Sequence, residues 1–279
     1  MARPDSLRDE VVRHFSHRRA DTAVAIPAEE RYSSEDLRDL PEEAVSCSDG
    51  CGNPLLYTDI RPGDRVLDLG SGAGLDLLLA ARRTGPQGSV VGVDMTGSMI
   101  ELARSNARRA GLANIEVREG LIEKLPVESE SIDWVISNCV INLSPEKAKV
   151  WAEIVRVLKP KGRLLISDTL VAHVPEWQRW LSARVNGLVE VLLDEESYLR
   201  TMRASGLASI EIKERTQFTG PRLRKMLAAE VGRFQRRDPR GAKKAVAAAE
   251  RLLLSPMLLV GEKMLADKVS SIKVFAQKP

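Results

Sequence analysis

Cysteine is scarce in this sequence. Its 279 residues include three cysteines, Cys47, Cys51 and Cys139, which are too few for the disulfide framework of a small secreted protein. So low a count suits a reducing compartment. We therefore expect three free thiols, or thiols that serve as ligands.

Long apolar runs and strong net charge are missing as well. The longest nearly apolar run, 252–260, is interrupted by Ser255 and Pro256 and is far too short to span a bilayer. The chain begins without the apolar core of a signal peptide, and its net charge of +3 is too small to indicate nucleic-acid binding. We expect a cytoplasmic protein that has neither a membrane nor a nucleic acid as its partner.

Histidine is equally rare, with three residues in the chain. His14 and His17 are three positions apart, a spacing that suits one face of a helix, but we interpret them as solvated surface side chains and expect no metal site. The remaining composition, 43% hydrophobic and 29% charged, is ordinary for a globular protein.

What the sequence does have is a glycine-rich turn between a strand and a helix. Residues 66–69 read as a buried strand, Gly70, Gly72 and Gly74 follow at once, and a helix begins near Leu75. Glycine lets the backbone turn tightly and lets a ligand approach it, while the helix start presents unpaired N–H groups. This pattern indicates a nucleotide-type binding loop.

Two acidic residues decide which nucleotide cofactor fits the loop. Asp94 ends the second strand, about twenty positions after the glycines, where a carboxylate can accept hydrogen bonds from two ribose hydroxyls. Asp68 directly precedes the loop, where it would repel a pyrophosphate but attract the ammonium of an amino-acid moiety. The pattern therefore favours S-adenosylmethionine over a dinucleotide.

Strands and helices alternate along the middle of the chain. We expect strands at 66–69, 90–93, 115–117, 132–137 and 163–167, and helices at 75–83, after Thr96 or Ser98 up to Gly111, and at 146–158. This rhythm predicts an α/β fold with a Rossmann-like, doubly wound sheet whose ligands bind at the carboxyl ends of the strands. Several polar residues fall at such ends: Asp68, Asp94, Glu123, Asn138 and Cys139.

The flanking segments are expected to cover this core. Residues 1–58 read as an N-terminal arm and cysteine loop, with a short helix that Ser34 caps. Residues 59–279 read as the cofactor-binding domain, in which 171–205 and 219–268 form a helical cap on the substrate side. The segment 222–251 is rich in arginine and lysine, which we interpret as a solvated helix surface rather than an anion-attracting flank.

Five short segments together resemble the arsenite methyltransferases, a branch of the class I S-adenosylmethionine-dependent methyltransferases. They are Gly-Cys-Gly-Asn-Pro at 50–54, the glycine loop at 66–74, Val-Gly-Val-Asp-Met at 91–95, Ile-Glu-Lys-Leu-Pro at 122–126 and Ser-Asn-Cys-Val-Ile-Asn-Leu-Ser at 137–144. The glycine motif is general to the superfamily, whereas the two cysteine segments are specific to the branch.

The resemblance implies a role for each matching residue. Asp68, Gly70, Ser71, Gly72 and Gly74 would hold the methionine part of S-adenosylmethionine, Asp94 and Met95 its ribose, and Ile122 and Glu123 its adenine, with Asn138 beside them. Cys51 and Cys139 would be arsenic ligands and therefore the catalytic pair.

The chain departs from the family pattern at its third cysteine, which the family places about 45 residues after Cys139. Arg184 occupies that position here. Trivalent arsenic is thiophilic, so two thiolates can hold a singly methylated arsenic, a small thiol can complete the site, or Cys47 can supply the third sulfur. Arg184 can instead pair with a carboxylate substrate.

Three functions follow. The leading one is a cytoplasmic methyltransferase that transfers methyl to trivalent arsenic or a similar soft acceptor held by two cysteines. The second is a S-adenosylmethionine-dependent enzyme that acts on a small organic molecule near Arg184, with His173, Glu176 and Asp168 as candidate bases. The third is a binding protein without turnover. The oligomeric state is left open.

Overall fold

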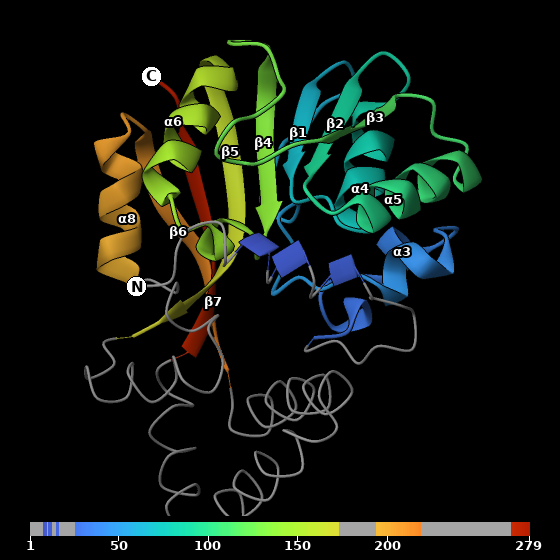
Figure 1. The fold of residues 1–279 in the computed structure, drawn as a ribbon, viewed down its shortest axis with the longest axis horizontal. Coiled ribbons are helices and arrows are strands. Elements are labelled where there is room, and N and C mark those ends of the chain that lie inside the picture. Colours follow the sequence, from blue (N-terminus) through green and yellow to red (C-terminus); the bar gives the residue numbers. More distant parts are fainter. Residues whose placement is uncertain (1–7, 10, 13–14, 17–25, 173–193, 219–268) are drawn as a thin grey trace, which may run out of the picture.

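The computed structural model describes residues 8–9, 11–12, 15–16, 26–172, 194–218 and 269–279. Its centre is a seven-stranded sheet in the order β3-β2-β1-β4-β5-β7-β6 (Figure 1). The strands are β1 (Arg65–Leu69), β2 (Ser89–Asp94), β3 (Ile115–Glu119), β4 (Ile132–Asn138), β5 (Leu158–Val171), β6 (Ala208–Gln217) and β7 (Val269–Gln277). β7 runs antiparallel to its neighbours β5 and β6, whereas the pairs on the other side are parallel. The predicted doubly wound α/β fold is thus confirmed.

Helices cover both faces of the sheet. On one face, α4 (Leu75–Thr84) and α5 (Gly97–Arg109) pack on a core that includes Val66, Trp134 and Leu165. On the other, α6 (Lys147–Val157) and α8 (Glu195–Ala204) pack on a core that includes Leu67 and Leu164. Because side chains alternate along a strand, neighbouring residues of β1 and β5 serve opposite cores.

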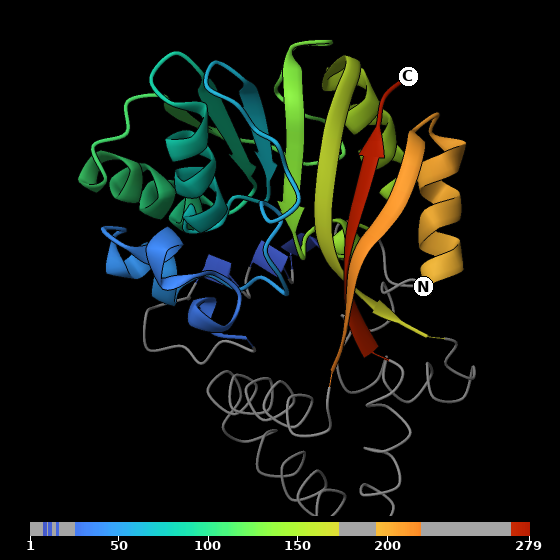
Figure 2. The same cartoon turned by 180° about the vertical axis from the view of Figure 1, so that it is seen from behind.

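A short N-terminal segment lies below the carboxyl ends of the central strands, as both views show (Figures 1 and 2). It contains η1 (Ala28–Glu30), α2 (Ser34–Leu37) and α3 (Glu42–Ser46), and the 3-10 turn η2 (Ile141–Leu143) follows β4. This segment brings the first two cysteines of the chain to the end of the sheet where ligands bind in this class of fold.

The structure corrects three local expectations. Ser33, not Ser34, caps α2, because its side chain accepts from the Asp36 N–H while the Asp36 carboxylate accepts from the Ser33 N–H, which together form a capping box. The helix α3 was not expected. β5 begins at Leu158 rather than Arg163, because residues before the Pro160–Gly162 turn already pair with Ile132.

Much of the expected cap, including 173–193 and 219–268, lies outside the described residues, together with Arg184, His173 and Glu176. The same holds for His14 and His17. None of the helices in the described part of the chain has the length and apolar character that a membrane crossing requires.

Candidate functional site

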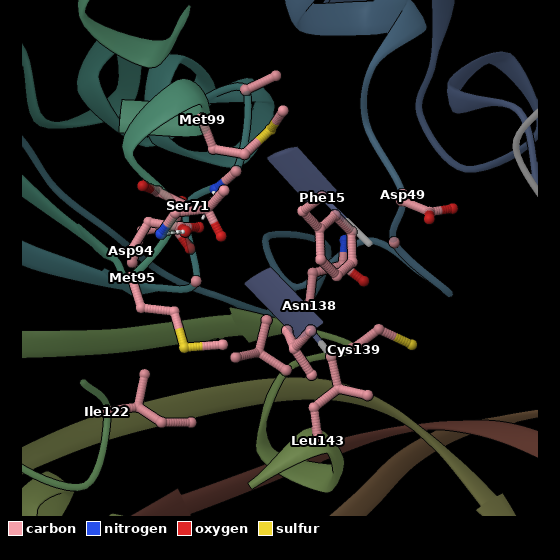
Figure 3. Close-up of a pocket in the computed structure, with 18 of the residues that line it drawn as sticks. Phe15, Asp49, Ser71, Asp94, Met95, Met99, Ile122, Asn138, Cys139 and Leu143 are labelled. Carbon is pink, nitrogen blue, oxygen red and sulfur yellow. Dashed lines mark hydrogen bonds between the residues drawn. The ribbon is translucent and has the colours of Figure 1, made fainter. Parts of the chain in front are cut away.

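A pocket of about 1030 Å³, part of it open to solvent, lies at the carboxyl ends of β1, β2 and β4. Figure 3 shows its lining residues around the central space. It gathers most of the residues that the sequence singles out: Asp68, Gly70, Ser71, Gly72, Asp94, Met95, Ile122, Glu123, Asn138, Cys139 and Cys47. Gly74 and Cys51 are not in its lining.

The glycine loop turns sharply between β1 and α4. Gly70, Gly72 and Gly74 have φ values of 66°, 50° and 94°, a left-handed region that favours glycine. A Cβ on Gly70 would lie 2.4 Å from Val140, whereas a Cβ on Gly72 would find its first neighbour, the Gly70 carbonyl oxygen, at 4.0 Å. The backbone at Gly72 is therefore open to a ligand, while Gly74 serves as the N-cap residue of α4.

Two buried polar atoms in this loop have no hydrogen-bond partner among the described residues. They are Oδ2 of Asp68, whose residue is 2% exposed, and the Ser71 hydroxyl. Burial, and then the nearby carboxylates of Asp76 and Asp94, hold the pKa of Asp68 well above its usual range. An orphaned buried carboxylate is costly, so a bound ammonium fits here well.

Asp94 is fixed by backbone groups at the end of β2. Its carboxylate accepts from the N–H groups of Gly72 at 2.9 Å and Thr96 at 2.8 Å. Burial raises its pKa, although these hydrogen bonds favour the charged form. The carboxylate thus faces the pocket in a fixed position, as a ligand of ribose hydroxyls requires.

The part of the pocket that is expected to face adenine combines apolar side chains with one carboxylate held by hydrogen bonds. Met95, Met99 and Ile122 line it, whereas Glu123 accepts from the Ser144 hydroxyl at 2.7 Å and from the Arg8 guanidinium at 3.2 Å. Arg8 also binds Glu146. The N-terminal arm therefore reaches the pocket, which sequence reasoning missed.

The structure joins Cys51 and Cys139 in a disulfide, with their Cα atoms 5.8 Å apart. The expectation of three free thiols is therefore wrong for this pair. Cysteine count and spacing do not reveal that the loop before β1 and the end of β4, 88 residues apart, meet in space. Cys47 is not part of this disulfide; it is buried and lies in the pocket lining.

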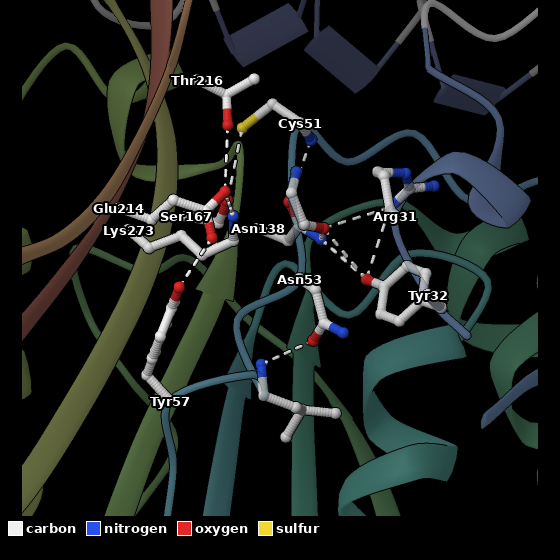
Figure 4. Close-up of polar contacts among 12 residues, drawn as sticks. Arg31, Tyr32, Cys51, Asn53, Tyr57, Asn138, Ser167, Glu214, Thr216 and Lys273 are labelled. Atoms are coloured by element: carbon white, nitrogen blue, oxygen red, sulfur yellow. Dashed lines mark hydrogen bonds and ion pairs between the residues drawn. The ribbon is translucent and has the colours of Figure 1, made fainter. Parts of the chain in front are cut away.

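Asn138 holds the cysteine loop in place (Figure 4). Its Oδ1 accepts from the N–H of Cys51 at 3.0 Å, and its Nδ2 donates to the Gly52 carbonyl at 2.8 Å and to Asp76 at 3.0 Å. A Cβ on Gly50 would lie 2.3 Å from the Asn138 amide nitrogen. The side chain expected to meet the cofactor has these loop contacts instead, and its contact with the cofactor stays a prediction.

A buried tyrosine completes this arrangement. The Tyr32 hydroxyl donates to Asp76 at 2.7 Å and accepts from Asn138 at 3.1 Å. Burial raises the pKa of Asp76, against the opposing effect of the hydrogen bonds that Asn138 and Tyr32 donate to its carboxylate. Neither residue was expected at the site. Asp76 sits in the first turn of α4, where an acid is common in any helix, and no motif links it to Tyr32.

Asp168, a candidate base, faces away from this pocket. Its side chain lies on the face of β5 that packs against α8. There its Oδ2 accepts from the Tyr198 hydroxyl at 3.1 Å and from the Asn142 N–H at 3.2 Å. It is absent from the pocket lining. The structure therefore contradicts its role as a base and gives it a structural one.

Together, these features of the fold and the pocket define a class of protein. Class I S-adenosylmethionine-dependent methyltransferases have a sheet with one antiparallel strand, a glycine loop after the first strand and an acidic residue, here Asp94, at the end of the second. A family model described as "Methyltransferase domain" matches residues 60–208. The chain belongs to this methyltransferase family, as an arsenite methyltransferase-like member.

Individual relatives support this assignment. The chain is 40% identical over 189 residues to the arsenite methyltransferase of Halobacterium salinarum. The aligned region covers 67% of this chain and 48% of that protein. It is 40% identical over 155 residues to the enzyme of Mus musculus, covering 52% and 41%. The crystal structure of the arsenic(III) S-adenosylmethionine methyltransferase of Chlamydomonas reinhardtii matches with a TM-score of 0.66 and 29% identity, over 88% of this chain and 72% of that one. The chain spans about half the length of these curated relatives or less.

Proposed function

We propose that this protein transfers a methyl group from S-adenosylmethionine to trivalent arsenic or a similar soft acceptor held by Cys51 and Cys139. One observation carries the proposal. Two cysteines that are 88 residues apart in sequence have their sulfurs in contact, and one of them, Cys139, lines the same pocket as Asp68 and Asp94. A thiol pair beside a cofactor pocket suits a thiophilic acceptor.

The residues present fit the cofactor. Asp68 and Ser71 would meet its amino-acid end with buried oxygens that have no partner in the described part of the chain, the backbone at Gly72 would lie open to it, and Asp94 would accept from its ribose hydroxyls. Met95 and Ile122 would offer apolar contacts for adenine, with the Glu123 carboxylate in the same lining. When bound, S-adenosylmethionine supplies an electrophilic methyl group on a sulfonium.

The thiol pair explains what the chain itself must do. Two thiolates fill two of the three bonding positions of trivalent arsenic and leave its lone pair free. The third position then belongs to a carbon substituent, a small thiol or Cys47, which lines the same pocket. The chain's contribution is to hold the acceptor in a fixed orientation toward the cofactor pocket, since positioning dominates a displacement of this kind. The disulfide must be reduced before the acceptor binds.

The test is methyl transfer by reduced protein. Wild type, Cys51→Ser, Cys139→Ser and Cys47→Ser would be incubated with S-adenosylmethionine and either arsenite or a trivalent monomethyl arsenical, and S-adenosylhomocysteine would be measured. We expect both pair variants to lose at least 90% of turnover while they still bind S-adenosylhomocysteine. Full turnover in Cys51→Ser and Cys139→Ser would contradict the proposal.

The same assay separates the other two functions. Turnover of an organic acceptor that survives removal of both cysteines would favour the small-molecule enzyme with Arg184 at its site. Absence of S-adenosylhomocysteine with every acceptor, combined with tight arsenical binding, would favour a binding protein.

A further inference from the structure

Strand β5 places two hydroxyls beneath the two sulfurs. Ser167 and Thr169 are two residues apart, so they lie on the same face of the strand. The Ser167 Oγ lies 3.8 Å from the Cys51 Sγ, and the Thr169 Oγ1 lies 3.4 Å from the Cys139 Sγ. Ser167 is 0% exposed and Thr169 is 9% exposed. Each sulfur therefore has its own buried hydroxyl.

The surrounding backbone is built to accept this arrangement. A Cβ on Gly52 would lie 2.2 Å from the Ser167 hydroxyl, so the residue after Cys51 has to be glycine while Ser167 points this way. On the other side, the Cys139 N–H donates to the Ser167 carbonyl at 2.7 Å, and Cys139 has a φ of 62°. The loop with Cys51 and the segment with Cys139 therefore both pack closely against β5, next to the two sulfurs.

A purely structural role would give these hydroxyls other partners. Buried serine and threonine side chains usually bond to backbone carbonyls, as Ser137 does to the Leu69 carbonyl. Among the described residues, the hydrogen-bonding partner of each of the two β5 hydroxyls is a cysteine sulfur. This is the feature that sets them apart from an ordinary buried hydroxyl.

The charged side chains near Cys51 and Cys139 are bound to groups other than the two sulfurs. Lys273 of β7, which approaches Gly52, binds Glu214 of β6 at 2.5 Å, and Tyr57 donates to the same carboxylate (Figure 4). Asp76 is engaged by Tyr32 and Asn138, and Asp49 also lines the pocket. Within the described part of the chain, the direct polar contacts to the sulfurs come from the two hydroxyls.

We propose that Ser167 and Thr169 are positioning residues that donate hydrogen bonds to the thiolates of Cys51 and Cys139 once their disulfide is reduced, and so hold two sulfurs as a preformed ligand pair. A hydrogen bond to a charged acceptor is stronger than one to a neutral acceptor, so the hydroxyls favour the reduced, ligand-ready pair over the disulfide. The identity of the metalloid bound by this pair rests on the proposed function, whereas the effect on the sulfurs does not.

The chemistry balances with a dithiol as reductant. The dithiol is oxidised to its own disulfide and releases two protons to solvent, while the S–S bond of Cys51 and Cys139 breaks and the two sulfurs take up two electrons as thiolates. With an arsenical that carries two hydroxyls, each As–S bond then forms as an As–OH bond breaks, and each hydroxide takes up one proton from solvent and leaves as water.

The first measurement is the thiol–disulfide equilibrium of the pair. Wild type, Ser167→Ala, Thr169→Val and Thr169→Ser would be equilibrated at pH 7 in mixtures of reduced and oxidised dithiothreitol, and reduced cysteines counted by alkylation and mass. We expect Ser167→Ala and Thr169→Val each to favour the disulfide by about tenfold, which is about 30 mV for two electrons. Thr169→Ser keeps the hydroxyl and should match wild type. Ser137→Ala is the matched control and should leave the equilibrium unchanged.

The second measurement is binding of phenylarsine oxide to the fully reduced proteins, followed by calorimetry. We expect Ser167→Ala and Thr169→Val to bind several-fold more weakly, and Thr169→Ser and Ser137→Ala to bind like wild type. Equilibria and affinities that are unchanged in Ser167→Ala and Thr169→Val would overturn the inference. So would equal losses in Thr169→Ser, because they would indicate packing rather than a hydroxyl.

Failure of this inference is distinguishable from failure of the proposed function. A shifted thiol–disulfide equilibrium in a protein that methylates no arsenical would keep the hydroxyl roles and remove the metalloid acceptor. Methylation that needs both cysteines but is unchanged in Ser167→Ala and Thr169→Val, together with an unchanged thiol–disulfide equilibrium, would keep the metalloid acceptor and remove the roles of the hydroxyls.

Discussion

At the scale of single residues, Cys139 stands out because its backbone is left-handed. A side chain with a φ of 62° costs roughly 1–2 kcal/mol relative to ordinary conformations. Such strain usually persists where a side chain is needed in one place. Here it aims a sulfur at Cys51, which supports a ligand role over simple packing.

This strain can be measured in the reduced protein. We expect Cys139→Gly to unfold in urea with a free energy about 0.5–1 kcal/mol higher than that of Cys139→Ala, because glycine relieves the left-handed strain but gains freedom in the unfolded chain. The same pair of substitutions at Cys47, where φ is −89°, should rank in the opposite order. Equal stabilities at position 139 would contradict the strain argument.

Asp68 is the residue on which cofactor affinity should depend most. Because its buried Oδ2 has no partner among the described residues, Asp68→Asn should weaken binding of S-adenosylhomocysteine about 10- to 100-fold, the range for a lost hydrogen bond to a charged group. Calorimetric titration would measure it. Asp133→Asn, which removes a carboxylate bonded to Lys159 at the far end of β4, should bind normally. Unchanged affinity in Asp68→Asn would remove Asp68 from the cofactor site.

At the scale of elements, β5 links the site to the helices behind the sheet. Its residues alternate: Ser167 and Thr169 face the cysteines, while Asp168 between them binds Tyr198 of α8 and the backbone of η2 through Asn142. Burial raises the pKa of Asp168 to about 7, although Tyr198, Lys147 and two N–H groups favour the charged form.

A stability change with pH follows from this buried carboxyl. Between about pH 4 and pH 7 the folded protein keeps a proton on Asp168 that the unfolded chain has lost. The contribution of the protonated Asp168 to the free energy of unfolding is therefore complete below about pH 4 and is lost as the pH rises to about 7. Asp168→Asn lacks this effect. The free energy of unfolding of wild type minus that of Asp168→Asn should therefore fall from pH 5 to pH 7 and then level. Urea titrations at pH 5, 6, 7 and 7.5 test this, and a constant difference would contradict it.

The elements themselves were largely predictable, and the reason is local. Apolar runs such as 66–69 and 132–137 and the glycine loop determine strand and helix from short-range pattern, and the polar residues after them gather at one edge because the strands are parallel. The contacts of Arg8, Tyr32 and Asp76 could not be foreseen, since they join distant segments without a motif. The disulfide was missed for the same reason. So were the hydrogen bonds of Asn138 to Cys51 and Gly52, because motif spacing does not show that the cysteine loop packs against the end of β4.

At the scale of the whole molecule, one covalent bond ties the N-terminal segment to the sheet. It closes a loop of 88 residues, for which chain entropy predicts a stabilisation of roughly 4.6 kcal/mol. The oxidised protein should therefore be more stable than the reduced one, although only the reduced one has the thiols of Cys51 and Cys139 for an acceptor.

Urea unfolding with and without a dithiol reductant would measure this difference. We expect reduction to lower the free energy of unfolding of wild type by roughly 4.6 kcal/mol, and to leave that of the Cys51→Ser/Cys139→Ser double variant unchanged. Equal stability of oxidised and reduced wild type would indicate that the bond does not constrain the unfolded chain.

The close approach of Gly52 to Ser167 has an evolutionary consequence. With a serine at position 167, any side chain at 52 meets its hydroxyl at 2.2 Å, so the loop cannot change first. A lineage that drifts away from thiol chemistry can lose the hydroxyl, then the glycine, and only afterwards the cysteine context, whereas the reverse order passes through a misfit. One contact between a backbone and a hydroxyl therefore sets the order in which these two positions can change.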